Sequence, residues 1–287
     1  MKTRLMNVVK MIGILLLVVV VILIVIIVIN NKEQKRQQAL MVKSDEDLIG
    51  IHYYVPRNGK EDVDCNLYIH EDGERHPLII NLHGGAFIAG DADTLDSQSD
   101  RISKQWNSNV VTVNYKLAKG GYDISYGTEE VIDTVQFFIK HADEYGIDTD
   151  RIFVLGYSAG AYHAMAAVLK LKENGIDIAG QIICYGFIKE VNETYLSQDE
   201  SFRRSLCPSL FILADNDPIS EGSLIYQKSL EENGIDTEVK KYDDSRHGFI
   251  EENNQEYEVL KAAGKSPEQE DMARDAEKYI FDWINRK

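Results

Sequence analysis

The sequence predicts an α/β fold in which helices cover both faces of a mostly parallel sheet, with one transmembrane helix preceding it. Three observations predict this arrangement. The chain has 287 residues, which leaves room for one large domain of about 250 residues after a short N-terminal segment. An uncharged apolar run occupies residues 11–29. Beyond it, short apolar runs alternate with segments of helical periodicity.

The apolar run near the N-terminus reads MIGILLLVVVVILIVIIVI and contains no charge. At about 1.5 Å of rise per residue, a helix of this length spans the hydrocarbon core of a bilayer. The alternative is a cleaved signal peptide, whose apolar region is usually shorter and ends at small residues. Here polar residues follow from Asn30 without an A-x-A pattern. We predict a tail at 1–10, a transmembrane anchor at 11–30, a polar stalk at 31–47 and a folded domain at 48–287.

The charges bear on topology and on partners. Basic residues flank both ends of the anchor, but the free amino terminus and Glu33 favour a cytoplasmic N-terminus. We therefore expect a single-pass membrane protein with an extracytoplasmic domain. The net charge of the chain is −16, and residues 1–36 carry a net +5, so residues 37–287 carry about −21. Such a surface repels polyanions, which argues against nucleic acid as a partner.

The secondary structure of residues 48–287 follows from periodicity. Strand-like alternation at 49–55 and 63–69, around a turn-rich segment, predicts an opening hairpin. Five further apolar runs are typical of buried parallel strands: residues 77–82, 109–115, 151–155, 181–185 and 209–214. Helical spacing marks residues 130–142, 223–230 and 267–283, and residues 237–242 are strand-like. Functional groups in such sheets gather beyond the carboxyl ends of the strands.

The first candidate for chemistry follows the strand at 151–155. The segment GYSAG at 156–160 matches G-x-S-x-G and precedes an apolar helix at 161–169. This pattern is typical of a nucleophile elbow, a strand-to-helix turn so tight that Gly156 and Gly160 must lack side chains. The turn pushes the hydroxyl of Ser158 into the cleft. We predict Ser158 as the nucleophile.

The second candidate is a glycine-containing loop directly after the strand at 77–82. It reads HGGAF at 83–87, in which His83 and Gly84 shape the loop. Backbone N–H groups there can bind the negative charge that develops on a carbonyl oxygen under attack. We assign the donors to Gly85, Ala86 and Ala159. A plain turn with two glycines is the alternative.

A serine nucleophile needs a base and an acid. With a nucleophile elbow of this kind, the three residues follow in the chain order Ser, Asp, His. His247 follows the strand-like segment at 237–242, and Asp217 follows the strand at 209–214. Asp215 is the rival acid, but we favour Asp217 because the loop must carry the carboxylate toward the histidine. The other histidines suit surface or packing roles: His52, His70, His76, His141 and His163.

These motifs together resemble the α/β-hydrolase superfamily, and within it the esterase group related to hormone-sensitive lipase and bacterial acetyl esterases. The resemblance runs from about residue 48 to 287. It is carried by HGGAF at 83–87, NYKLA at 114–118, DRI at 150–152, GYSAG at 156–160, DP at 217–218 and HGF at 247–249. It implies a catalytic domain that hydrolyses carboxylic esters through a Ser158, His247 and Asp217 triad and an acyl-enzyme.

Two departures from the family pattern bear on the substrate. Lys119, Gly120 and Gly121 stand where the group commonly has proline and glutamate. Only residues 188–204 separate two predicted strands, so the cap that encloses acyl chains in that group is reduced. A short, acetyl-like acyl group on a small molecule or a polymer is then the expected substrate, and residues 251–265 are a candidate substitute lid. A peptidase or amidase of the same fold, or a non-catalytic binding domain, are the alternatives.

No metal or organic cofactor is expected, because the mechanism needs none and the sequence shows no ligand cluster or phosphate-binding glycine loop. Cys65, Cys184 and Cys207 are odd in number and lack C-x-x-C spacing, so a disulfide framework is not indicated.

Overall fold

The computed structural model describes residues 31–32, 35–36, 41–186, 189–253 and 267–287. The chain divides into two compact units, Met1–Leu40 and Met41–Lys287. In the first unit the described residues are helical. The predicted tail and anchor, residues 1–10 and 11–30, lie outside the described residues. Among the residues that the structure does describe, no helix is both long and apolar enough to cross a bilayer.

The second unit is built on one eight-stranded sheet in the order β1-β2-β4-β3-β5-β6-β7-β8. Strand β2 pairs antiparallel with β1 and with β4, and the remaining pairs are parallel, as predicted. The strands are β1 Ile51–Val55, β2 Val63–Tyr68, β3 His76–Leu82, β4 Asn109–Val113, β5 Ile147–Tyr157, β6 Gly180–Cys184, β7 Ser209–Asn216 and β8 Thr237–Arg246. The predicted hairpin is present as β1 and β2.

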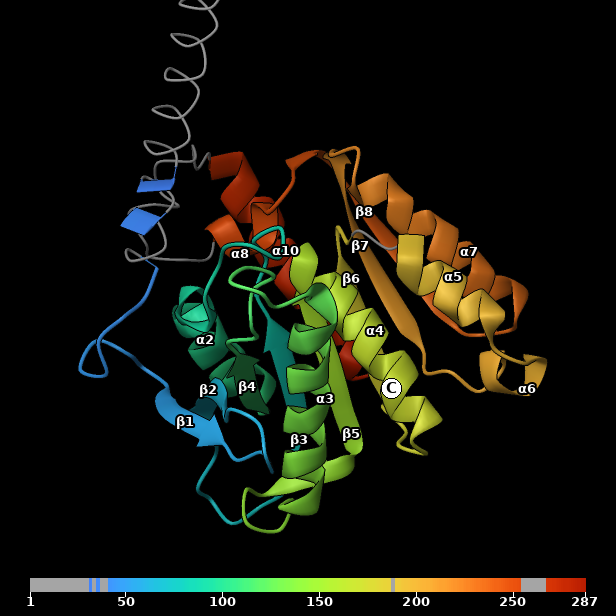
Figure 1. Cartoon of the computed structure of the whole chain (residues 1–287). Helices are drawn as coiled ribbons and strands as arrows, with labels where there is room; N and C mark the ends of the chain where they lie inside the picture. The colour runs from blue at the N-terminus through green and yellow to red at the C-terminus, as the bar shows by residue number, and fades with distance from the viewer. Residues whose placement is uncertain (1–30, 33–34, 37–40, 187–188, 254–266) are drawn as a thin grey trace, which may run out of the picture. The chain divides into compact units, whose positions relative to one another are not determined.

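Helices cover both faces of this sheet (Figure 1). One core lies under α3 (Ile124–Lys140), α4 (Ala159–Glu173), α5 (Lys189–Ser197) and α7 (Ser223–Glu232). The other lies under α2 (Asp96–Trp106), α8 (Phe249–Asn253) and α10 (Pro267–Ile284). Alternate side chains of β5 pack into the two cores, with Val154 in the first and Phe153 in the second. This double burial explains why the parallel strands are continuous apolar runs.

Several helices differ from the sequence prediction. Helix α3 begins at Ile124 rather than residue 130, because Asp123 caps it by accepting from the Ser125 N–H at 2.8 Å. The polar helix α2 was not predicted, since its sequence DSQSDRISKQW lacks a clear apolar period. Five further elements were also missed: η1 Ala92–Leu95, α5, α6 Glu200–Arg203, η2 Ser220–Gly222 and α8.

The N-terminal edge of the second unit is fixed by one buried carboxylate. Asp96 accepts hydrogen bonds from Lys43 Nζ at 2.6 Å, from the N–H groups of Ile49 and Gly50, and from the Tyr68 hydroxyl at 2.8 Å. Hydrogen bonds from these donors hold the pKa of Asp96 below its usual value despite its burial. Residues 43–50 are therefore tied to α2, so the end of the predicted stalk at 31–47 packs against the domain.

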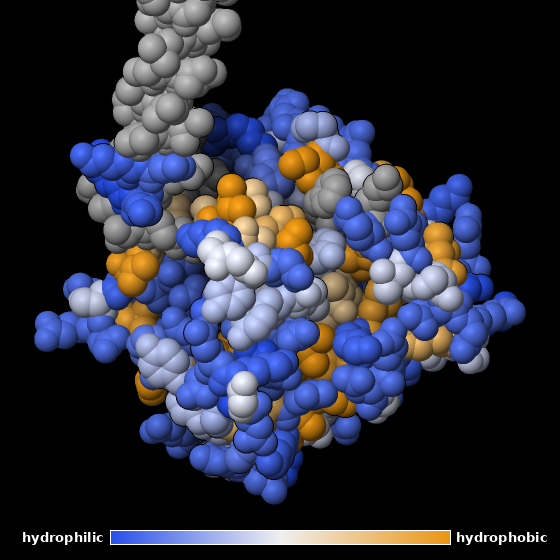
Figure 2. Space-filling view, viewed as in Figure 1, coloured by the Kyte–Doolittle hydropathy of each residue, from blue (hydrophilic) through white to orange (hydrophobic). Residues whose placement is uncertain are grey.

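The surface of the second unit is mainly hydrophilic on the face drawn in Figure 2, with small apolar groups between the charged side chains. The exposed large apolar residues are scattered along the described chain: Val42, Ile49, Ile51, Tyr54, Ile88, Leu196, Ile219, Leu224, Ile225 and Val239. Scattered exposure of this kind is usual for a folded domain.

Candidate active site

The turn between β5 and α4 has the geometry of a nucleophile elbow. Ser158 adopts φ 52° and ψ −113°, a positive-φ conformation that residues with a side chain rarely take. The turn is anchored by the Ser158 N–H, which donates to the Cys184 carbonyl at 2.9 Å at the end of β6. This strained turn, fixed by the neighbouring strand, holds the hydroxyl at the carboxyl end of the sheet.

The two glycines of the motif are required by close backbone contacts. A Cβ on Gly156 would lie 2.3 Å from the Gly160 carbonyl oxygen. A Cβ on Gly160 would lie 2.3 Å from the carbonyl oxygen of Leu82 and 2.5 Å from that of His83. The elbow is therefore pressed against the end of β3, where the second motif begins. A side chain on Gly160 would push these two segments apart, and a side chain on Gly156 would distort the elbow itself.

The structure brings Ser158, His247 and Asp217 together from three loops. His247 follows β8, and its Nε2 lies 2.8 Å from Ser158 Oγ. Its Nδ1 lies 2.6 Å from Asp217 Oδ2, in the loop after β7. Because a carboxylate only accepts hydrogen bonds, the proton belongs on Nδ1, which leaves Nε2 to accept the serine proton. Such a chain can transfer a proton away from the serine hydroxyl.

Asp217 is positioned to contact His247, whereas Asp215 is not. Asp217 is almost fully buried, and its Oδ1 accepts a hydrogen bond from the Ile219 N–H at 2.9 Å. Asp215 forms an ion pair with Lys241, whose Nζ lies 2.5 Å from Asp215 Oδ1. That hydrogen bond holds the pKa of Asp215 below its usual value. The rival acid considered at the sequence level is therefore engaged with β8.

The loop after β3 lies directly beside the elbow. A Cβ on Gly84 would lie 3.4 Å from Ser158 Cβ. Gly85, Ala86 and Phe87 all have positive φ, at 132°, 52° and 66°, so the loop reverses sharply. The reversal is closed by the Gly85 carbonyl, which accepts from the Ile88 and Ala89 N–H groups. Few residues tolerate this backbone, which explains why the segment is built from small residues.

The reversal leaves backbone donors near the serine. The N–H groups of Gly85 and Ala86 have no protein acceptor within the described residues. Ala159 is the first residue of α4, where helical N–H groups lack an intrahelical partner. The positive end of the helix dipole also points to this place. These three predicted donors can together bind a negatively charged oxygen.

His83 supports the loop from below. Its Nδ1 lies 2.7 Å from the Gly84 carbonyl oxygen, and its ring stacks on Tyr115 with centroids 4.2 Å apart. The Tyr115 hydroxyl donates to the His83 carbonyl at 2.7 Å. Burial lowers the pKa of His83 to about 4, so the ring is neutral at physiological pH. The His163 ring also contacts Tyr115, with centroids 4.3 Å apart, and burial lowers the pKa of His163 to about 3. Both histidines thus pack beneath the loop, as expected from the sequence.

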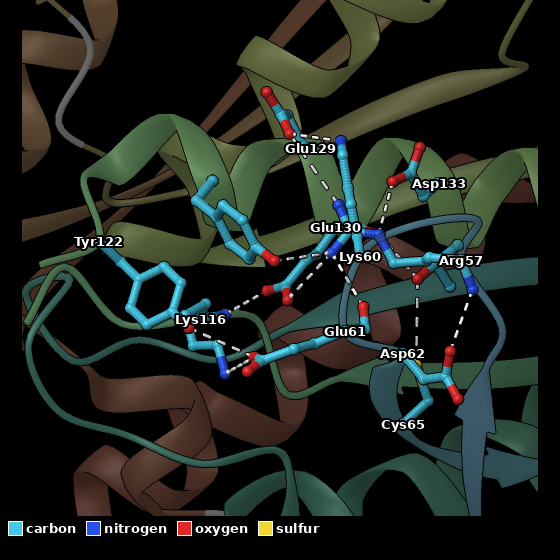
Figure 3. Close-up of polar contacts among 12 residues, drawn as sticks. Arg57, Lys60, Glu61, Asp62, Cys65, Lys116, Tyr122, Glu129, Glu130 and Asp133 are labelled. Atoms are coloured by element: carbon cyan, nitrogen blue, oxygen red, sulfur yellow. Dashed lines mark hydrogen bonds and ion pairs between the residues drawn. The ribbon is translucent and has the colours of Figure 1, made fainter. Parts of the chain in front are cut away.

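A partly buried polar network holds the segment that carries Tyr115 (Figure 3). Glu130 of α3 accepts a hydrogen bond from the Lys116 N–H, and burial raises the pKa of Glu130 to about 7. Lys116 Nζ lies 2.7 Å from Glu61 Oε2, and the nearly buried Arg57 lies 2.7 Å from Asp133. The network joins the β1–β2 hairpin to α3. An acid therefore does contact this segment, although the sequence lacks the family's proline-glutamate.

Tyr185 and Glu251 were not identified from the sequence as site residues. Tyr185 follows β6 with φ 42°, and its ring centroid lies 5.2 Å from that of His247. Its hydroxyl donates to Glu251, whose Oε1 lies 3.2 Å from where a Cβ on Gly84 would be. The pair thus connects His247 to the loop after β3. The available signal for Tyr185 was an aromatic residue directly after a strand. Glu251 was not singled out because it falls within residues 251–265, which we predicted as a lid. Residues 254–266 lie outside the described part of the chain.

The comparisons with known proteins agree with this architecture. Residues 79–204 match a protein family described by its alpha/beta hydrolase fold. An acetyl esterase from Salmonella enteritidis is 25% identical, with 66% of this chain and 70% of that protein covered. The solved carboxylesterase EstE1, from a metagenomic library, is 20% identical with a TM-score of 0.67, covering 88% of this chain and 94% of that one. A solved structure of fungal esterases from Rhizomucor miehei is 20% identical with a TM-score of 0.69, covering 90% of this chain and 89% of that one.

The chain therefore has the α/β-hydrolase fold. The expected resemblance to the esterase group that includes bacterial acetyl esterases is confirmed. The relatives support a hydrolytic enzyme of the carboxylesterase type.

Asp215, near the end of β7, and Asp217, just after it, make a matched pair for testing the site. We predict that Asp217→Asn lowers kcat for ester hydrolysis by about 10³ to 10⁴-fold, because the amide donates to His247 and favours the wrong tautomer. Asp215→Asn removes only an exposed ion pair and should change kcat by less than about twofold. Steady-state kinetics on p-nitrophenyl acetate measures both. Equal losses in the two variants would contradict the assignment of Asp217.

Proposed function

We propose that the protein is a serine carboxylester hydrolase that acts on short-chain, acetyl-like acyl esters through an acyl-enzyme. The observation that carries this proposal is the continuous hydrogen-bonded chain from Ser158 Oγ through His247 to Asp217, with separations of 2.8 and 2.6 Å. The serine lies in an elbow whose geometry exposes the hydroxyl, beside a loop with backbone donors. Each part of an acyl-transfer site is then supplied by a separate strand end.

The proposed reaction has two similar halves. His247 accepts the Ser158 proton while Oγ attacks the ester carbonyl, and Asp217 orients the imidazole and stabilises its positive charge. The N–H groups of Gly85, Ala86 and Ala159 bind the oxyanion, each such donor contributing roughly 3 to 4 kcal/mol in other enzymes. His247 then protonates the leaving alcohol, and water repeats the attack on the acyl-enzyme.

The packing of the segment between β6 and β7 supports a substrate with a short acyl group. Helix α5 places Val191 and Tyr195 in the core shared with α4 and α7, and the Tyr195 ring lies 5.5 Å from that of Tyr226. The Tyr195 hydroxyl donates to the Arg203 carbonyl at 3.0 Å, which joins α5 to α6. This segment therefore covers the sheet and is not available to enclose a long acyl chain. The similarity to acetyl esterases agrees with a small acyl group.

We further propose that residues 11–30 anchor the enzyme in a membrane as a single pass, with residues 31–47 as a stalk and the catalytic domain extracytoplasmic. The length and apolar character of residues 11–29 support the anchor. The substrate would then be an ester on a small molecule or on a polymer outside the cytoplasm. No role for nucleic acid or for a cofactor is proposed.

The serine nucleophile is tested by substitution. Ser158→Ala should lower the hydrolysis of p-nitrophenyl acetate by at least about 10⁴-fold, because no other group can form the acyl-enzyme. The free energy of unfolding should not fall, since alanine preserves the backbone environment while removing only the hydroxyl. An unchanged rate in a folded variant would overturn the proposal. Measuring aminoacyl p-nitroanilides in parallel tests the peptidase or amidase alternative, which predicts the higher kcat/KM for the amide.

The topology is tested by a C-terminal reporter. Alkaline phosphatase fused after Lys287 should be active in intact cells, because it folds only when exported to an oxidising compartment. A green fluorescent protein fusion at the same position is the matched control and should be dark. Bright fluorescence with inactive phosphatase would place the domain in the cytoplasm and contradict the proposed orientation.

A further inference from the structure

A cluster of possible metal ligands lies at the end of the sheet opposite to Ser158. His70 follows β2, His76 is the first residue of β3, and Asp72 lies in the turn between them. One ligand atom from each of the three residues lies within 4.8 Å of the other two. We propose that His70, Asp72 and His76 bind a divalent transition-metal ion, of which Zn²⁺ is the best suited. The ion would join the β2–β3 connection to the end of α2.

The two imidazoles are oriented as metal-binding histidines usually are. His76 Nδ1 lies 3.2 Å from the Asn107 carbonyl oxygen, and His70 Nε2 lies 3.1 Å from the Ser103 carbonyl oxygen. A ring N–H that donates to a backbone carbonyl fixes the tautomer and leaves the other nitrogen as a lone pair. Both carbonyls belong to the last turn and C-cap of α2, and the Ser103 carbonyl also accepts a hydrogen bond from the Asn107 N–H. The helix end therefore orients both rings.

The nitrogen that remains on His76 faces a carboxylate. His76 Nε2 lies 3.0 Å from Asp72 Oδ1 and 3.1 Å from Oδ2. A neutral ring that donates from Nδ1 has only a lone pair at Nε2, and two acceptors at this distance repel each other. A metal ion bound by the nitrogen and the carboxylate would satisfy both lone pairs. The His70 ring stacks on His76 with centroids 4.4 Å apart, which places a third possible ligand beside the pair.

The separations suit a small cation. Zn²⁺ binds histidine nitrogen and carboxylate oxygen at about 2.0 to 2.2 Å in a tetrahedral arrangement, which places neighbouring ligand atoms about 3.3 Å apart. The distance between His76 Nε2 and Asp72 Oδ1 is already close to this value. The ligand atom of His70 lies within 4.8 Å of the other two, and its side chain is partly exposed. Two nitrogens and one carboxylate oxygen also match the preference of Zn²⁺ over Ca²⁺ or Mg²⁺.

The burial of the ligands leaves one coordination position open to solvent. The His76 side chain is 4% exposed and the Asp72 side chain is 50% exposed. Water can therefore complete the coordination from the side of Asp72. Since the cluster lies at the amino end of β3 and the candidate active site at its carboxyl end, the ion would stabilise the domain without taking part in ester hydrolysis.

The proposal is tested with the full-length, tag-free protein after removal of metals by a chelator. Zn²⁺ should bind with a stoichiometry of about one and raise Tm, because an ion that binds only the folded state stabilises it. Asp72→Asn and His70→Gln should each weaken Zn²⁺ binding at least about tenfold and reduce the Tm shift. Both residues are partly or half exposed, so these variants test the site without emptying the buried position of His76.

The matched control is His52→Gln. His52 lies between two carboxylates, Asp45 at 3.2 Å and Asp64 at 2.5 Å, but has no second histidine beside it. This variant should bind Zn²⁺ as the wild type does, and esterase activity should be unchanged in His70→Gln and Asp72→Asn. Failure of the wild type to bind Zn²⁺, or binding that persists in both cluster variants, would overturn the proposal.

Discussion

The contact between the elbow and the end of β3 is the constraint on which the site depends. The carbonyl oxygens of Leu82 and His83 approach the Cα of Gly160 so closely that no side chain fits between them. This contact sets the distance between the first turn of α4 and the loop that carries Gly85 and Ala86. Without it, the proposed nucleophile and the proposed oxyanion donors would belong to separate surfaces. The strained φ of Ser158 persists because the sheet holds both of its neighbours in place.

The other supports act on this contact from different sides. Tyr115 stacks on His83 and donates to its carbonyl, and Glu130 in turn holds the backbone of Lys116. Tyr185 packs against His247 and donates to Glu251 beside Gly84. The loops that meet here are therefore not independent. A buried ring or carboxylate links each one to the next, which is how a site assembled from strand ends gains a fixed geometry.

The fold and the motif residues could be predicted from the sequence because their signals are local. Continuous apolar runs identify strands buried on both faces, and the glycines around Ser158 mark a turn that nothing larger can form. The supporting residues could not be predicted in this way. Glu130 lies on a helix and contacts Lys116, fourteen positions earlier, while Tyr185 and Glu251 are sixty-six positions apart. Helix α2 was missed because its buried face is largely polar, with Asp96, Gln98 and Ser99 inside.

The opposite ends of β3 illustrate the limits of local patterns. His83, at its carboxyl end, stands in a recognisable loop motif, whereas His70 and His76, at its amino end, were assigned to surface or packing roles. Only the folded chain brings Ser103 and Asn107 to their ring nitrogens and shows a carboxylate facing His76. The spacing of two histidines six residues apart in a turn carries no such signal. The arrangement comes from the end of α2.

The central claim, that Ser158 is activated by His247, is tested most directly by covalent labelling. A fluorophosphonate reacts with a serine only when a base and an oxyanion site activate it. Intact-mass measurement and peptide mapping should show one adduct, on Ser158, and labelling should be lost in Ser158→Ala and strongly slowed in His247→Ala. An unlabelled wild-type protein, or an adduct on a different serine, would contradict the account.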